Sequence, residues 1–175
     1  EIKQIQQYSN NLRLKNIDTT DRLVGEITLF LHRLEHHAES TFPKLANDES
    51  VFEQKTILVV DDDARNVYAL SSILESKGLT SIKSFDGLSA LEKLAENPKI
   101  DLVLMDIMMP KMDGYETMRR IRQQTAFKTL PMIALTAKAM NGDRQKCIDA
   151  GANDYLTKPL DTDQLLSLMR VWLAK

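Results

Sequence analysis

Features that are absent from the sequence exclude several classes of protein. Cys147 is the only cysteine among 175 residues, which excludes an intrachain disulfide and a cysteine-rich zinc site. No apolar run approaches the ~18 residues that a membrane-spanning helix needs, and no signal peptide opens the chain. A formal net charge of −2 lacks the basic excess typical of nucleic-acid-binding proteins. We therefore expect a globular cytoplasmic protein without direct nucleic-acid or membrane contacts, and we interpret Glu1 as the start of a piece cut from a longer chain.

The chain divides into two parts with different patterns. Residues 1–40 form a predicted helical segment. Residues 41–54 form a predicted linker, because turn formers such as Pro43 and Asn47 interrupt any sustained apolar period. Residues 55–175 carry a strong alternating pattern, which predicts one domain of about 120 residues.

Apolar runs typical of buried strands alternate with helical spacing throughout this domain. The runs predict strands at 56–60, 80–85, 101–105, 131–136 and 154–157. A helix is predicted after each strand, at 114–123 and 141–150 among them, with Gly78 ending the first and Asp161 capping the last. Continuous apolar strands that alternate with helices indicate a parallel sheet with helices on both faces. The expected fold class is α/β, a doubly wound five-stranded parallel sheet.

Polar side chains stand where these strands end. The first strand is followed by Asp61, Asp62 and Asp63, the third by Asp106 and the fifth by Lys158, and the fourth ends at Thr136. Ligands of doubly wound sheets bind beyond the carboxyl ends of the strands, and carboxylates without His or Cys favour a hard cation such as Mg²⁺. Each residue alone also has an ordinary explanation as a helix cap or turn. Their joint placement at four strand ends predicts one functional site.

Four segments carry a resemblance to a known family: ILVVDDD at 57–63, LVLMDIMMPKMDGYE at 102–116, PMIALTA at 131–137 and GANDYLTKP at 151–159. In their order and spacing they resemble the receiver domain of two-component response regulators. The resemblance covers residues 55–175. It implies a flavodoxin-like, CheY-like fold with strand order 2-1-3-4-5, and a role in phosphorelay signal transduction.

The resemblance also implies an acceptor and a metal site. Asp106 would accept a phosphoryl group from a phosphohistidine on a histidine kinase or a histidine phosphotransfer domain. Asp62, Asp106 and the backbone carbonyl of Met108 would bind Mg²⁺, and Asp61 would reach the ion through water. Because carboxylates oppose the addition of a phosphoryl dianion, the reaction is expected to need Mg²⁺ and to be abolished by Asp106→Asn.

The remaining implied roles concern the response to phosphorylation. Lys158 would bind a phosphoryl oxygen, Thr136 would move to donate a hydrogen bond to the phosphoryl group, and Tyr155 would follow it inward as an aromatic switch. The bond between Lys158 and Pro159 is a candidate cis peptide. Asp63 matches no required role, and we interpret it as negative charge at a helix N-terminus.

Two positions bear on the lifetime of the phosphorylated state. They are Met108, two residues after the acceptor, and Lys138, two residues after the switch threonine. Neither is a carboxylate or amide that could orient an attacking water. The hypothesis is therefore a slowly hydrolysing aspartyl phosphate.

Residues 18–38 predict a helix with an apolar stripe that includes Leu23, Ile27 and Leu31. It contains all three histidines, but their surroundings lack the pattern of a phosphodonor histidine, and exposed polar residues are the preferred interpretation. The helix is expected to pack on the domain or to pair with another copy of the chain.

Residues 15–23 parallel residues 158–166 without a gap: lysine, aspartate, threonine and leucine recur, although Asn16 replaces Pro159. This parallel suggests the last strand and helix of a truncated second receiver, and the alternative is an unrelated linker helix. Tandem receivers are typical of hybrid sensor kinases, so the expected parent is a hybrid histidine kinase with residues 55–175 as its C-terminal receiver.

Two other functions compete with a phosphoacceptor receiver. One is an enzyme, an Asp-nucleophile phosphatase, although Asp61-Asp62-Asp63-Ala64 matches the motif of that family poorly. The other is a degenerate receiver that only binds proteins, which the complete set of strand-end residues argues against. As a receiver, the fragment would catalyse only its own phosphorylation and dephosphorylation.

Overall fold

The computed structural model describes residues 49–137 and 143–174. The predicted helix at 18–38, its possible pairing, the parallel at 15–23 and Lys138 lie outside the described residues. The elements follow one another along the chain as η1 (Glu49–Phe52), β1 (Thr56–Val60), α3 (Ala64–Ser76), β2 (Thr80–Ser84), α4 (Gly87–Glu96), β3 (Leu102–Asp106), α5 (Gly114–Gln123), η2 (Thr125–Phe127), β4 (Met132–Thr136), α6 (Asp143–Asp149), β5 (Asp154–Thr157) and α7 (Thr162–Leu173).

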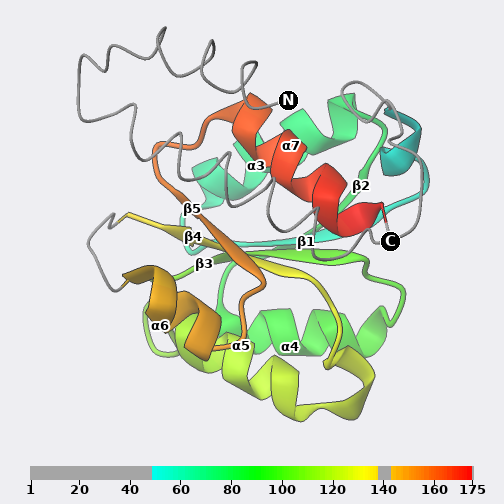
Figure 1. Ribbon diagram of the computed structural model, residues 1–175. Coiled ribbons are helices and arrows are strands. Elements are labelled where there is room, and N and C mark those ends of the chain that lie inside the picture. Colours follow the sequence, from blue (N-terminus) through cyan, green and yellow to red (C-terminus); the bar gives the residue numbers. More distant parts are fainter. Residues whose placement is uncertain (1–48, 138–142, 175) are drawn as a thin grey trace, which may run out of the picture. The chain divides into compact units, whose positions relative to one another are not determined.

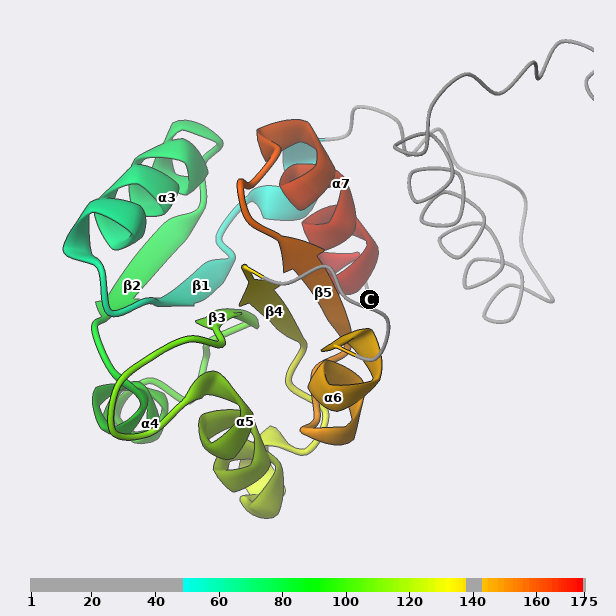
Figure 2. The same ribbon diagram turned by 90° about the vertical axis from the view of Figure 1, so that its left-hand side faces the viewer.

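The five strands form one parallel sheet in the order β2-β1-β3-β4-β5. Helices α3 and α7 cover one face, and α4, α5 and α6 cover the other (Figures 1 and 2). Each connection is a strand, helix and parallel strand, which is the arrangement that alternating apolar and helical patterns predict. The doubly wound, flavodoxin-like fold with strand order 2-1-3-4-5 is confirmed.

The core lies on both faces of the sheet because its central strands are runs of apolar residues, broken only at their ends by Thr56, Asp106 and Thr136. All residues of β3 and β4 are buried, and so are the last four of β1. Alternate side chains of these strands point to opposite faces, and one set packs with residues of α4, α5 and α6 that include Leu94, Met118 and Cys147. The edge strand β2 is only partly buried, which fits its weaker apolar pattern.

Of the five α-helices in residues 49–137 and 143–174, four begin at an aspartate N-cap. The carboxylates of Asp63, Asp86, Asp113 and Asp161 accept hydrogen bonds from backbone N–H groups of the first turn, at 2.8–2.9 Å. Such caps satisfy donors that a helix leaves unpaired and favour negative charge at the N-terminus. The predicted cap at Asp161 is confirmed, and Gly78, with φ +81°, follows the last turn of α3 as predicted.

Element boundaries differ slightly from those predicted. Strand β3 spans Leu102–Asp106 rather than 101–105, because the carboxylate of Asp101 instead accepts hydrogen bonds from Thr56 N–H at 2.8 Å and Lys55 Nζ at 3.1 Å. Strand β4 starts one residue later than predicted, after Pro131, which has no N–H to donate to the ladder. Of the helix predicted at 141–150, the described part is Asp143–Asp149.

Within the predicted linker 41–54, residues 49–52 form η1 against α7. Phe52 is fully buried, and the guanidinium carbon of Arg170 lies 5.2 Å from the centroid of its ring. None of the helices at 49–137 and 143–174 is long and apolar enough to cross a membrane.

Candidate functional site

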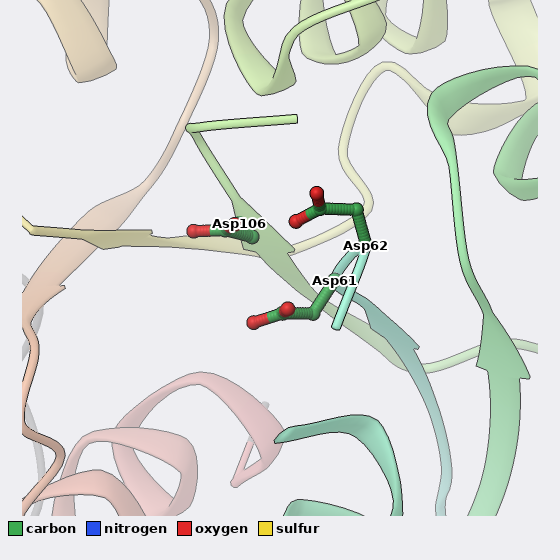
Figure 3. Close-up of side chains that lie close together, drawn as sticks. All are labelled: Asp61, Asp62 and Asp106. Carbon is green, nitrogen blue, oxygen red and sulfur yellow. The ribbon is translucent and has the colours of Figure 1, made fainter. Parts of the chain in front are cut away.

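Three carboxylates meet where β1 and β3 end. These strands are neighbours, and Val60 at the end of β1 pairs with Met105, so the residues that follow, Asp61 and Asp106, stand at the same edge of the sheet. Oxygens of Asp61, Asp62 and Asp106 all lie within 4.8 Å of one another (Figure 3). Asp61 and Asp106 are buried and Asp62 is exposed. The group thus has two fixed carboxylates and one open to solvent.

Lys158 joins the two buried carboxylates from the end of β5. Its Nζ lies 2.7 Å from Asp61 Oδ2 and 2.9 Å from Asp106 Oδ1. Its backbone N–H donates to the carbonyl of Thr136 at 2.7 Å, which ties the residue to the end of β4. The bond between Lys158 and Pro159 is cis, as predicted. Lys158, which follows Asp61 by 97 residues in the sequence, therefore places a positive charge within the acidic group.

The electrostatics of the site follow from burial and from this contact. Burial raises the pKa of Asp106 above 3.8, while Lys158 and the N–H of Met108 act in the opposite direction. Burial alone would lower the pKa of Lys158, but its hydrogen bonds and charge interactions with the two aspartates outweigh burial and raise it. Lys158 is therefore a permanent cation between two buried carboxyl groups.

Asp63 behaves differently from its neighbours. As the N-cap of α3, it is contacted by Arg65 through Nε at 3.0 and 3.1 Å and Nη2 at 2.6 Å. These side-chain hydrogen bonds, with that from the Arg65 backbone, lower the pKa of Asp63 to about 2. Its predicted place as negative charge at a helix N-terminus is confirmed.

The two predicted switch residues lie on adjacent strands. Thr136 is the buried last residue of β4, and it pairs with Thr157 of β5. Tyr155 lies earlier on β5, half-buried against the hydrophobic core. Met108 follows Asp106 in the loop after β3, with an exposed side chain and a backbone N–H directed to the Asp106 carboxyl.

One residue in contact with the site was not predicted from the sequence. The Asn66 amide, in the first turn of α3, donates to Asp61 Oδ1 and Oδ2, both at 3.1 Å. The signal in the sequence that could have identified Asn66 is its spacing. A residue five positions after Asp61 and three after an N-cap lies on the helical turn that faces the end of the strand.

The donor set suits a hard divalent cation. It consists of carboxylate oxygens, two of them buried, with an exposed third through which an ion can approach. Mg²⁺ prefers such oxygen ligands and usually retains several waters. Asp61, Asp62 and Asp106 could therefore hold a metal ion.

The whole arrangement agrees with a match to a known family. The family model described as the response regulator receiver domain matches residues 57–170. This chain belongs to the response regulator receiver family. The resemblance inferred from the four sequence segments is confirmed. The three aspartates and Lys158 are the candidate functional site of this receiver.

Relatives of the receiver include parts of sensor kinases. The signal transduction histidine-protein kinase BarA of Escherichia coli (strain K12) is 35% identical over 151 residues, which are 86% of this chain and 16% of that protein. The sensor histidine kinase CheAY of Helicobacter pylori is 35% identical over 115 residues, 65% of this chain and 14% of that protein. The chain thus spans about one sixth or less of these relatives.

A solved structure resembles the receiver over nearly its whole length. It is the receiver domain of the sensor histidine kinase PA1611 from Pseudomonas aeruginosa PAO1, which holds a magnesium ion in its active-site cleft. Its sequence is 38% identical, with a TM-score of 0.64, and the match covers 69% of this chain and 98% of that structure.

Proposed function

We propose that this receiver accepts a phosphoryl group on Asp106 from a phosphohistidine of a histidine kinase or a histidine phosphotransfer domain. A carboxylate oxygen of Asp106 attacks phosphorus, the P–N bond breaks, and its electron pair returns to the imidazole of the donor. The observation that carries the proposal is the contact of Lys158 with Asp106 at 2.9 Å. Asp61 and Asp106 are both buried beside Lys158, but Asp106 is the last residue of the central strand β3, whereas both oxygens of Asp61 already accept hydrogen bonds from the Asp63 N–H or the Asn66 amide.

The other residues are assigned by what they can offer a phosphoryl group. Lys158 neutralises one phosphoryl oxygen, and the Thr136 hydroxyl at the neighbouring strand end donates to another. Asp61, Asp62, Asp106 and the carbonyl of Met108 would hold Mg²⁺, which when bound supplies positive charge that offsets the repulsion between carboxylates and a phosphoryl dianion. Tyr155 follows Thr136 in a shift between two conformations that phosphorylation biases.

Intact-mass spectrometry after incubation with acetyl phosphate tests this function. We expect the mass of one phosphoryl group to be gained with Mg²⁺ and not without it, and Asp106→Asn to gain none. Asp113→Asn is the matched control, because Asp113 is an exposed N-cap outside the acidic group. A chain that binds Mg²⁺ but gains no mass, even from a phosphorylated partner domain, would instead be a protein-binding module.

The same samples measure the lifetime of the phosphorylated state. Met108 presents no carboxylate or amide to an attacking water, so we expect the isolated protein to keep its phosphoryl group for many minutes after acetyl phosphate is removed. Decay within seconds would contradict slow hydrolysis.

We also propose that the parent chain is a hybrid sensor histidine kinase. The match to BarA covers 151 residues, whereas residues 55–175 number 121, so at least 30 matched residues precede residue 55. The similarity therefore extends into the segment in which the end of a second receiver is predicted. Sequencing the gene upstream of Glu1 tests this, since a kinase catalytic domain is expected there, and a chain that starts shortly before Glu1 would contradict it.

Self-association through the predicted helix at 18–38 is a separate proposal. Its apolar stripe needs a partner. Sedimentation of residues 1–175 and 46–175 tests it, because only the longer chain is expected to dimerise.

A further inference from the structure

We propose that Asn66 is a positioning residue for the acidic group: it holds the Asp61 carboxylate in place and keeps it hydrogen-bonded when Lys158 turns to a phosphoryl group. The inference rests on the proposed function for its second half. Its first half, the fixing of Asp61, stands on the contacts alone.

The Asp61 carboxylate is buried and accepts four hydrogen bonds. Oδ1 accepts from the N–H of Asp63 at 2.9 Å and from the amide of Asn66 at 3.1 Å. Oδ2 accepts from the same amide at 3.1 Å and from Lys158 Nζ at 2.7 Å. A buried carboxylate is stable only when its oxygens have such donors. Asn66 is the only one of these three residues that contacts both oxygens, so it determines the orientation of the carboxylate plane.

Lys158 contacts both Asp61 and Asp106, and this gives the Asn66 amide a second role. Lys158 Nζ lies 2.7 Å from Asp61 and 2.9 Å from Asp106. When a phosphoryl group on Asp106 attracts this ammonium, the Asp61 oxygen that it leaves needs another donor. The Asn66 amide already contacts that oxygen, and because the amide is neutral it adds no charge that would repel a cation or a phosphoryl group.

A purely structural explanation of Asn66 is weaker. The N-cap of α3 is Asp63, whose carboxylate accepts from Arg65 N–H and whose carbonyl accepts from Asn66 N–H at 3.0 Å. The side chain of Asn66 takes no part in this cap. Asparagine also favours helix interiors less than leucine or alanine does, so helix formation does not account for its presence.

The test compares Asn66→Leu with the wild type by calorimetric Mg²⁺ titration and by intact mass during incubation with acetyl phosphate. Leucine has the same number of side-chain heavy atoms, branched at the same γ carbon, and a higher helix propensity, but it donates no hydrogen bond. We expect Mg²⁺ affinity and the phosphorylation rate at saturating Mg²⁺ each to fall about tenfold, the lower end of the effect of residues that orient metal ligands. Arg65→Ala is the matched control on the same turn and is expected to change neither.

Thermal melts separate this role from a structural one. Each Asp61 oxygen keeps one donor in Asn66→Leu, the Asp63 N–H or Lys158 Nζ, so the variant is expected to melt near the wild-type temperature. Asn66→Ala, which adds no bulk, is measured alongside and answers the question if the leucine variant does not fold. Wild-type Mg²⁺ affinity in a folded variant would overturn the proposal, as would losses that Arg65→Ala shares. If the wild type gains no phosphoryl group, the proposed function has failed, and the Mg²⁺ titration still decides whether Asn66 fixes Asp61.

Discussion

The Asp106 carboxyl group is almost completely buried. Burial raises its pKa above 3.8, and this effect outweighs the lowering of the pKa by Lys158. A carboxyl group with a raised pKa holds its proton more tightly in the folded chain than in the unfolded one. Its contribution to stability is fully present below pH 3.8 and is lost as the pH rises through the folded pKa. The site is therefore less stable than a neutral one at pH 7, which is a common property of functional carboxylates.

Asp106→Asn is expected to raise the melting temperature by a few degrees at pH 7 in buffer without Mg²⁺. The variant removes the buried charge, and Lys158 keeps its ion pair with Asp61. Melting temperatures of both proteins from pH 3.5 to 7.5 check the direction of the pH dependence. The difference in melting temperature between the variant and the wild type is expected to grow as the pH rises above about 4. A gap that stays constant or shrinks with rising pH would contradict this account.

At the scale of elements, Arg122 joins the end of α5 to the segments before β4 and β5. Its guanidinium donates to the carbonyls of Gly151, Phe127 and Leu130 and to Asn153 Oδ1, at 2.7–2.9 Å. Burial lowers the pKa of Arg122. One planar group thus donates to four oxygens from two connecting segments at the edge of the sheet opposite the acidic group.

Arg122→Met is expected to lower the free energy of unfolding by about 3 kcal/mol, because it removes a charged donor from four partly buried oxygens, of which only Phe127 O and Asn153 Oδ1 keep a backbone donor. Arg122→Lys is expected to recover less than half of the loss, since an ammonium cannot reproduce the planar fork. Arg120→Ala on the same helix removes only an exposed ion pair with Glu116 and is expected to cost less than about 0.5 kcal/mol. Urea denaturation measures all three variants, and equal losses at both positions would contradict the assignment.

Gly87 and Gly114 begin helices at positions where an added Cβ would meet other atoms too closely. Substitution by alanine is expected to have different consequences at the two positions. A Cβ on Gly114 would overlap the backbone carbonyl of Asp106 and lie 2.8 Å from Ile107 Cα, so α5 would move away from the end of β3. A Cβ on Gly87 would instead meet side chains, those of Thr117 and Met112. We expect both alanine variants to lose about 1–3 kcal/mol of stability, and only Gly114→Ala to slow phosphorylation by acetyl phosphate. Equal phosphorylation rates would show that the acidic group tolerates movement of α5.

The elements were largely predictable because their signals are local. Apolar runs give the central strands, Asp63 and Asp161 mark the starts of the first and last helices of the domain, and parallel topology brings Asp61 and Asp106 to one edge. The contacts of Arg122 and Asn66 could not be predicted, because they depend on how distant segments pack. Arg120 and Arg122 look alike in the sequence, and only the fold places one in solvent and the other among backbone carbonyls.

At the scale of the whole molecule, the structural unit begins before the matched family region. The family model starts at residue 57, whereas the compact unit starts at residue 46 and includes η1. Polar turn formers in 41–54 predict a linker, and the single aromatic residue that η1 buries gives no periodic signal. Phe52 is nonetheless as deeply buried as the strands are.

Removing residues 1–45 is therefore expected to leave the stability of the receiver unchanged, whereas removing residues 1–54 is expected to lower it by about 3 kcal/mol or more. The second truncation deletes Phe52, and loss of a buried phenylalanine side chain typically costs about 3–5 kcal/mol. Urea denaturation of 46–175 and 55–175 measures the difference, and Phe52→Ala in the full chain separates the side chain from the rest of η1. If 55–175 proved as stable as 46–175, η1 would be an appendage, and the receiver would begin at β1. If the point variant reproduces most of the loss, Phe52 itself fixes the start of the receiver on α7.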